Sequence, residues 1–306
     1  MKNIGLPHNG LKGQYKTVLT KGDGTVVESP WFDNIILNTG LDILGSRTTG
    51  FAMGFLRLGT GTSAPSVTQT NVESFLATVG NNIPNSHVNL GAPNFHSVST
   101  IGYAFPQGAV IGNVTELATS PNSGSIGECF SRSLIVDNTN TPTALTVTAI
   151  DQLTVYYKMT VITSTADFVG SFVINGVTHN YTGRKARIES TFSNIAAGFN
   201  SSFSLMSQAI YYTNNASLGP ITESLLGTQG SNPTLFSERD VYTPGSHTCA
   251  QQVLYPATAG YNTPIKGFYI FFSDGNNQYQ IVLDTAIPKT SSNELKIKFG
   301  FSWGRV

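Results

Sequence analysis

Two stretches of this chain constrain its fold most, because each alternates apolar and polar side chains along its length. They are residues 152–161 and residues 294–303, the second close to the end of the sequence. The apolar members of the second stretch occupy alternate positions: Leu295, Ile297, Phe299, Phe301 and Trp303. Successive side chains of a strand point to opposite faces of the sheet. Each stretch therefore predicts a half-buried antiparallel strand whose apolar face needs a second layer to cover it.

Shorter candidate strands fill most of the remaining sequence, separated by turns rich in Gly, Pro, Asn and Ser. They are expected within residues 14–27 (a hairpin), 55–58 (a strand running into a loop), 103–118, 128–136, 145–149, 172–178 (a hairpin on Asn175 and Gly176), 204–212, 266–272 and 279–284. One or two helical turns end at Gly45, and residues 80–97 are interpreted as a long polar connection. This spacing predicts an all-β fold of two antiparallel β-sandwich-like units, of jelly-roll or Greek-key type, with at most short helices.

The length of 306 residues suits two units of about 150 residues each. We expect a flexible or partner-bound segment at residues 1–13, a first β-sandwich at 14–162 and a second at 163–306. Each unit is expected to be closed by one of the two long alternating strands.

Charge is scarce in this sequence. Only 11% of the residues are charged, against roughly 25% in an average soluble protein. Residues 1–162 carry 8 Lys or Arg and 9 Asp or Glu, and residues 163–306 carry 9 and 8. Neither half has the basic surface of a nucleic-acid-binding protein. A polar surface with little charge favours a subunit packed against copies of itself or other proteins, although a low-charge monomer is also compatible with it.

No apolar run approaches the ~20 residues that a membrane-spanning helix needs. The first ten residues lack the apolar core of a signal peptide. We therefore expect that the protein is made in a cytoplasm and does not insert into a membrane. The two cysteines, Cys129 and Cys249, are too few for a disulfide framework, so two free thiols are favoured over one bridge.

Short motifs follow one another in a characteristic order from about Gln14 onward. In the first half they are D-N-I-I at 33–36, G-L-D at 40–42, L-G-T-G at 58–61, A-P at 64–65, Y-A-F at 103–105, T-E-L at 115–117 and F-S-R at 130–132. In the second half they are A-I-Y at 209–211, G-P-I-T at 219–222, Y-Q-I at 279–281, P-K-T at 288–290 and W-G-R at 303–305. In this order the motifs resemble a family of tailed-bacteriophage virion proteins, described as tail fibre, minor tail or appendage proteins.

The resemblance implies a structural subunit of the virion, present in symmetric copies around the tail or neck, with no enzymatic activity. Long fibres of this kind carry extended repeats, a coiled coil or an intertwined triple β-stem, and this sequence has none of them. A compact collar, baseplate or adaptor piece is therefore an alternative to a host-binding fibre.

The sequence offers no catalytic, cofactor-binding or metal-ligating residue that we would assign. The histidines match no zinc spacing, and only His87 and His96 lie near enough in sequence for a metal pair to be considered. Glu116 and Glu128 are the candidates for a glycosidase-like carboxylate pair. The L-G-T-G loop at 58–61 lacks a phosphate-binding signature and is interpreted as a turn that needs positive φ.

Two clusters have both a functional and a structural interpretation. The basic run at 183–187 is either a contact for an acidic neighbour or anionic sugar, or a solvated strand or turn. Four tyrosines, Tyr211, Tyr212, Tyr269 and Tyr279, form either an exposed sugar-stacking platform or part of the core, and alternation favours the core.

Three functions are therefore considered. The first is a structural component of the virion, in the tail or neck, whose partners are copies of itself, as a ring or trimer, and other tail or neck proteins. The alternative is a receptor-binding module that recognises host surface polysaccharide. The third is a polysaccharide-degrading enzyme, for which the sequence supplies no anchor such as G-x-S-x-G.

Overall fold

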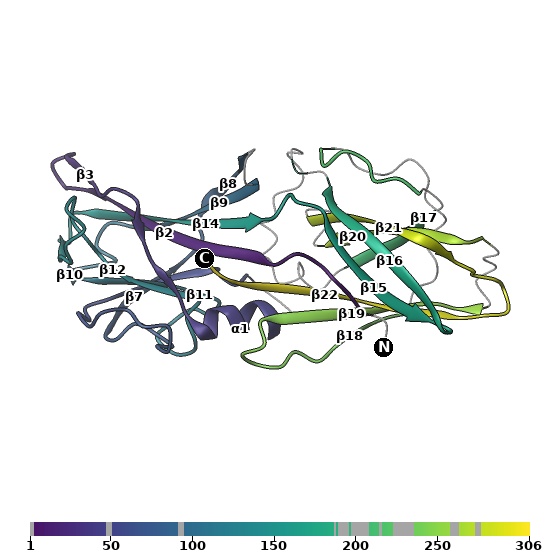
Figure 1. Ribbon diagram of the computed structural model, residues 1–306. Coiled ribbons are helices and arrows are strands. Elements are labelled where there is room, and N and C mark those ends of the chain that lie inside the picture. Colours follow the sequence, from purple (N-terminus) through teal and green to yellow (C-terminus); the bar gives the residue numbers. More distant parts are fainter. Residues whose placement is uncertain are drawn as a thin grey trace.

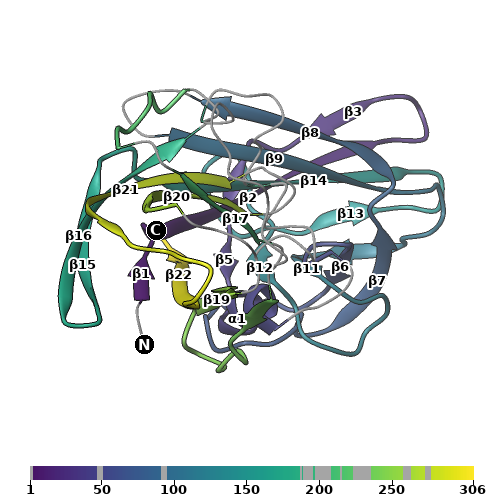
Figure 2. The same cartoon turned by 90° about the vertical axis from the view of Figure 1, so that its right-hand side faces the viewer.

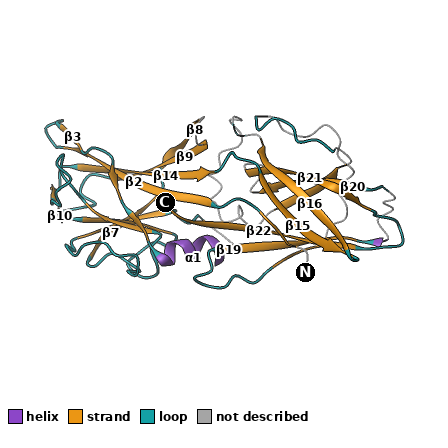
Figure 3. Cartoon of the chain, viewed as in Figure 1, coloured by secondary structure: helices purple, strands orange, loops and turns teal. Residues whose placement is uncertain are grey.

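The computed structural model describes residues 3–46, 51–90, 95–186, 188, 196, 208–213, 216–222, 236–257, 263–272 and 277–306. Strands dominate these residues, and they contain one α-helix, α1 (Asn38–Ser46). In Figure 3, α1 is the long purple helix among strands and loops. The prediction of an all-β fold with at most short helices is confirmed. The division into two sandwiches of jelly-roll or Greek-key type stays a prediction.

A ten-stranded sheet runs along the elongated molecule (Figure 1). Its main path, in spatial order, is β18 (Phe236–Arg239), β19 (Thr248–Tyr255), β22 (Leu295–Arg305), β2 (Asn9–Thr20), β14 (Gln152–Thr163), β9 (Phe95–Phe105) and β8 (Ile83–Leu90). Three short strands lie beside this path: β1 (Asn3–Gly5) on β22, and β3 (Val26–Glu28) and β4 (Phe32–Asp33) on β2. The two long alternating strands are β14 and β22, so both belong to one sheet.

The two ends of the chain meet in this sheet. β22 pairs with β19 over Leu295 to Ser302, and its last residues pair with the start of β2 in parallel, Asn9 opposite Trp303. β1 also pairs in parallel with β22. Residues 3–5 and 9–13, which we expected to be flexible or partner-bound, are therefore strand residues. Their partners in β22 lie almost 300 positions away, and the partners of residues 9–13 in β14 lie about 150 positions away, so no local pattern indicates them.

A second layer covers the part of this sheet formed by β2, β14 and β9. It is an antiparallel sheet in the order β5 (Ile35–Ile36), β12 (Ser131–Leu134), β11 (Glu116–Ser120), β6 (Phe55–Gly59) and β7 (Phe75–Gly80). A two-stranded sheet of β10 (Gly112–Val114) and β13 (Leu145–Val147) lies apart from it. Contacts between the layers are direct, since Tyr15 Oη lies 2.8 Å from Ser131 Oγ and the Phe130 and Tyr157 rings meet edge to face at 6.4 Å.

A further antiparallel sheet covers the β19 and β22 part. Its order is β15 (Phe168–Ile174), β16 (Val177–Ala186), β21 (Asn277–Ile287), β20 (Ile265–Phe272) and β17 (Gln208–Thr213). In Figure 2, β20 and β21 lie above β22 and β19. The Phe268 ring of β20 meets the Phe299 ring of β22 edge to face at 5.5 Å. The apolar face predicted for residues 294–303 is therefore buried, with all five alternating side chains at most 3% exposed.

Two hairpin predictions are confirmed. β15 and β16 turn at Asn175 and Gly176, whose φ angles of 49° and 78° are the pair of positive values that a type I′ turn requires. β2 and β3 form the other hairpin, with the turn closed by the Lys21 and Thr25 backbones.

The interpretation of residues 80–97 as a polar connection is wrong. Residues 83–90 form β8, which pairs with residues 96–102 of β9. Six of the eight residues of β8 are exposed, so the strand has no buried face and its sequence lacks the alternation that reveals a strand. Pro84 falls where the register with β9 shifts, which is a position that tolerates proline.

Candidate functional site

The histidines form no metal site in the described part of the chain. His87 and His96 lie on the neighbouring strands β8 and β9, where His87 is opposite Ser99 and His96 is opposite Leu90. His87 and Leu90 are three positions apart, so the two imidazoles point to opposite faces of the sheet. Among the described residues, no group of three or more His, Cys, Asp or Glu side chains could hold an ion.

The carboxylates considered for a glycosidase-like pair have different environments. Glu128 is exposed, whereas Glu116 on β11 is fully buried. Arg132 on β12 is also fully buried, and its Nε and Nη2 lie 2.8 and 2.7 Å from Oε2 of Glu116. The pair that the fold creates is an ion pair of Glu116 with Arg132, which no sequence spacing indicated.

Backbone groups complete the surroundings of the Glu116 carboxylate. Oε1 accepts hydrogen bonds from the N–H groups of Gly61 and Ser74 at 2.8 and 3.0 Å, and Oε2 accepts one from Glu73 N–H at 3.0 Å. One buried side chain therefore anchors both ends of the loop at residues 60–74. We interpret Glu116 as a structural residue, because its carboxylate oxygens are enclosed by donors of the protein itself.

The expectation of positive φ in the L-G-T-G loop is wrong. Neither Gly59 nor Gly61 has a positive φ. A Cβ atom at either position would instead collide with the side chain of Glu116. The glycines are needed because the carboxylate approaches the backbone closely. The requirement comes from a tertiary contact and not from the backbone conformation of the glycines themselves.

A second buried cation organises the loop at residues 121–130. The guanidinium of Arg57 donates to the carbonyls of Ile126 and Gly127 at 2.6 and 2.7 Å and to Asn71 Oδ1 at 2.8 Å. Cys129 lies beside it and is buried, and burial raises the pKa of its thiol to about 11 although Arg57 opposes that shift. Cys129 and Cys249 are both buried and not joined in a disulfide, which confirms the prediction of two thiols rather than one bridge.

The basic run at residues 183–187 does not form one cationic patch. Arg184 donates from Nε and Nη2 to both oxygens of the Asp167 carboxylate, at 2.6 and 2.7 Å. Lys185 is buried, with its Nζ 4.3 Å from the centre of the Tyr279 ring, and burial lowers the pKa of its ammonium group. Arg187 lies outside the described residues.

The tyrosine platform is not exposed where the structure describes it. Tyr212, Tyr269 and Tyr279 are at most 6% exposed and belong to the core, as alternation favoured. The side chain of Tyr211 lies outside the described residues.

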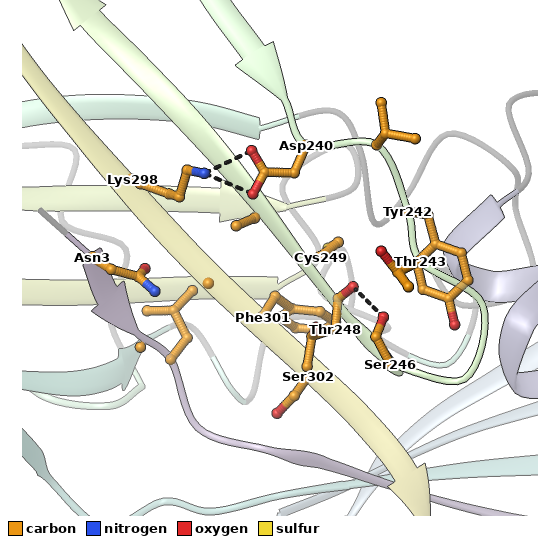
Figure 4. Close-up of a pocket in the computed structure, with 15 residues that line it drawn as sticks. Asn3, Asp240, Tyr242, Thr243, Ser246, Thr248, Cys249, Lys298, Phe301 and Ser302 are labelled. Atoms are coloured by element: carbon orange, nitrogen blue, oxygen red, sulfur yellow. Dashed lines mark hydrogen bonds and ion pairs between the residues drawn. The ribbon is translucent and has the colours of Figure 1, made fainter. Parts of the chain in front are cut away.

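A groove of about 610 Å³ lies over β1, β22 and β19 and beside the loop at residues 240–247 (Figure 4). Its floor includes three small residues in register on adjacent strands, with Gly300 opposite Gly5 on one side and Ala250 on the other. We call it the glycine groove. Two residues before Gly300 on β22, Lys298 is paired with Asn3 of β1. Two residues after it, Ser302 is paired with Thr248 of β19.

The polar side chains of the glycine groove are electrically balanced. Lys298 Nζ lies 2.7 Å from both carboxylate oxygens of Asp240. The other polar members are Asn3, Tyr242, Thr243, Ser246, Thr248 and Ser302. Figure 4 shows Asn3 on one side of the groove, Tyr242 and Thr243 on the other, and the Lys298 to Asp240 contacts between them. The described residues that line the groove are therefore rich in hydroxyl groups, and they carry no uncompensated charge.

The loop wall of the groove is fixed to helix α1 from the other half of the sequence. Asp42 Oδ1 accepts hydrogen bonds from Tyr242 Oη at 2.6 Å and from Gly245 N–H at 2.7 Å. The Tyr242 ring stacks on Trp303 at 6.0 Å, and a Cβ atom at Gly45 of α1 would collide with it. Burial, and secondarily the Asp42 carboxylate, raise the pKa of Tyr242.

Sequence reasoning missed the glycine groove. The local sequence gives one indication of it, which is glycine at positions 5 and 300. On the outer face of a strand these positions would usually carry a polar side chain. Neither glycine has a positive φ, and a Cβ at Gly5 would meet nothing within 4 Å. The significance of these residues depends on their register, which only the folded chain defines.

The comparisons with known proteins place the chain in no family. No family model matches it, and neither a search of curated proteins nor one of solved structures found a similar protein. No helix in the described part of the chain has the length and apolar character needed to span a membrane.

Proposed function

We propose that this protein is a structural subunit of a tailed-bacteriophage virion, located in the tail or neck and acting through protein–protein assembly. Its partners are copies of itself, in a ring or trimer, and neighbouring tail or neck proteins. The motif resemblance and the low content of charged residues support this proposal. The observation that carries it is the edge strand β8.

β8 has the features of a strand meant for pairing with another chain. It is the last strand of its sheet and pairs with β9 alone among the described strands. It contains no Asp, Glu, Lys or Arg, and Val88 and Leu90 are 53% and 48% exposed. Monomeric proteins protect such edges with charge, proline or bulges. Here Pro84 and the bulge protect only the beginning of the strand, and residues 86–90 stay in regular register.

An edge of this kind supports β-strand addition by a neighbouring subunit. Backbone N–H and C=O groups of the incoming strand pair with those of β8, and the alternating side chains determine the register. Burial of Val88 and Leu90 adds to the hydrogen bonds, since apolar area removed from water contributes about 25 cal/mol per Å². A stable contact requires more than about 1,000 Å² of buried surface in total, so flanking surfaces also take part.

The oligomeric state of the purified protein tests this proposal. We expect light scattering to give a defined oligomer, and Val88→Lys to weaken it, because a buried unpaired ammonium group at the edge opposes pairing. Ile126→Lys is the matched control, because Ile126 is 85% exposed on a loop and not on a sheet edge. A wild-type monomer at high concentration that binds no other virion protein would overturn the proposal.

The position of the protein in an intact particle is an independent test. Electron microscopy of the virion is expected to place copies of this chain symmetrically at the tail or neck. Absence of the chain from purified particles would exclude a virion role whatever its oligomeric state.

The second candidate function is a receptor-binding module for host surface polysaccharide, and the glycine groove favours it. The purified protein would then inhibit adsorption of the virus to its host, whereas an architectural part would not. Release of reducing sugar from host polysaccharide would instead indicate an enzyme and contradict both candidates.

A further inference from the structure

We infer that the glycine groove is a binding site for a neutral saccharide. This inference deepens the second candidate function by naming the site and the class of ligand, and it does not depend on the assembly proposal. It is carried by the volume of the groove, its polar side chains and its fixed wall. The glycine row explains how the groove comes to be hollow.

The fold does not require glycine at the floor of the groove. Neither Gly5 nor Gly300 has a positive φ, and a Cβ at Gly5 would meet nothing within 4 Å. A Cβ at Gly300 would meet the Asn3 side chain at 3.4 Å and the Ile4 carbonyl oxygen at 4.0 Å, which are ordinary contacts. Glycine in a strand interior costs about 0.5–1 kcal/mol relative to alanine. Its presence opposite Ala250 leaves a hollow in which a ligand can approach the backbone.

The side chains around this hollow match a ligand that carries many hydroxyl groups. Five of them bear hydroxyls, and a hydroxyl can donate one hydrogen bond and accept two. Tyr242 and Ser246 already donate to Asp42 and to the Thr248 carbonyl, and Ser302 Oγ lies 3.1 Å from His8 Nδ1, so these three hydroxyls offer a ligand mainly their remaining acceptor capacity. Asn3 adds an amide, which likewise offers donors and an acceptor. The volume of about 610 Å³ lies within the range of about 300–1,000 Å³ found for small-molecule sites.

The charge balance favours a neutral ligand over an acidic one. The ammonium group of Lys298 is already 2.7 Å from both oxygens of Asp240, so the lining residues that the structure describes offer no free cation to a carboxylate or sulfate. An anionic ligand would have to compete with Asp240 for Lys298, and the freed carboxylate would repel it.

The strands of the floor disfavour an extended peptide as the ligand. β22 is paired with β19 on one side and with β1 on the other, and β19 is also paired with β18. The backbone groups of β22, in the middle of the floor, are thus used within the sheet, and peptide recognition by strand addition needs a free edge. A saccharide relies on side-chain contacts, which this groove supplies.

The wall of the groove is held in place before any ligand binds. Asp42 fixes the loop through Tyr242 and Gly245, and Trp303 supports the Tyr242 ring. A preformed wall lowers the entropy cost of binding, because fewer groups must be ordered.

The test uses the full chain, an array of neutral and acidic oligosaccharides, and calorimetric titration with the neutral oligosaccharide that binds best. We expect binding by the wild type and at least a tenfold weaker affinity for Gly300→Val, whose side chain fills the hollow. Ser171→Val is the matched control, since Ser171 is exposed on β15 and outside the groove. It is expected to bind like the wild type.

Thermal unfolding establishes whether Gly300→Val is folded, and Asn3→Ala on the short strand β1 serves as the second variant. Asn3→Ala is also expected to weaken binding. Equal affinity of the folded groove variants and the wild type would overturn the inference. So would binding of acidic oligosaccharides or peptides only, or no binding to any neutral oligosaccharide at millimolar concentration. These outcomes leave the assembly proposal untouched, because light scattering tests that proposal without any saccharide.

Discussion

Replacement of Glu116 by glutamine is expected to lower the free energy of unfolding by about 3–5 kcal/mol, the cost of breaking a buried ion pair from one side. The change keeps the shape of the side chain, so no cavity contributes. Oε1 can still accept from Gly61 and Ser74. The new NH₂ group replaces Oε2, where it faces Glu73 N–H and two donors of Arg132 at 2.7–3.0 Å. Donors then face donors, and the guanidinium is left buried beside a neutral side chain.

Urea unfolding of the wild type and of Glu116→Gln measures this loss, and an unchanged m value would show that both unfold from a similarly compact state. Hydrogen exchange is expected to accelerate first at residue 73, because its N–H loses its acceptor when the amide NH₂ replaces Oε2. Glu294→Gln is the control, because Glu294 is half exposed and pairs with Lys296 at 3.0 Å. It should change stability by no more than about 0.5 kcal/mol. A similar small change for Glu116→Gln would refute the reasoning.

Three further predictions concern other contacts. The pKa of Asp151 is lowered to about 2, chiefly by the Thr148 N–H, so its contribution is complete above the usual pKa of 3.8 and is lost as pH falls through 2. Urea midpoints measured from pH 5 to pH 2 should therefore fall less steeply for Asp151→Asn than for the wild type. Gly45→Ala should destabilise the protein by up to about 2 kcal/mol, because the clash with Tyr242 outweighs the better helix propensity of alanine; a higher melting temperature would contradict this. Cys129, with a pKa of about 11, should not react with a thiol reagent at pH 8 in the native protein and should react once urea unfolds it; labelling of Cys129 in the native protein at the rate seen in urea would be the contrary result.

The fold class could be predicted because strand alternation is a local property. Residues 294–303 bury every second side chain, and Asn175 and Gly176 specify their turn through backbone conformation alone. β8 could not be predicted, because a strand exposed on both faces has no buried partner to impose a period of two. β1 could not be predicted either, since the strand that it pairs with is β22.

The candidate site could not be predicted from local sequence either, because it also depends on pairing between strands that are distant in the sequence. The sequence contained Gly5, Ala250 and Gly300, but only strand register brings them into one row. The glycines at 59 and 61 were visible too, and were assigned to a turn when they in fact make room for Glu116. A glycine that is needed because another side chain approaches it closely cannot be distinguished, in the sequence, from a glycine that is needed for its own backbone conformation.

The sequence alone determined the β-rich class, the apolar faces of the long strands, the tight turn at residues 175–176 and the low charge of the surface. Each of these follows from a residue and its near neighbours, through side-chain alternation, backbone freedom or composition. The tertiary structure decided that the chain ends pair with one another, that Glu116 meets Arg132 in the interior, and that a groove opens over three strands. These features join residues far apart in sequence, and such pairs meet only when burial of the shared core brings their strands into register.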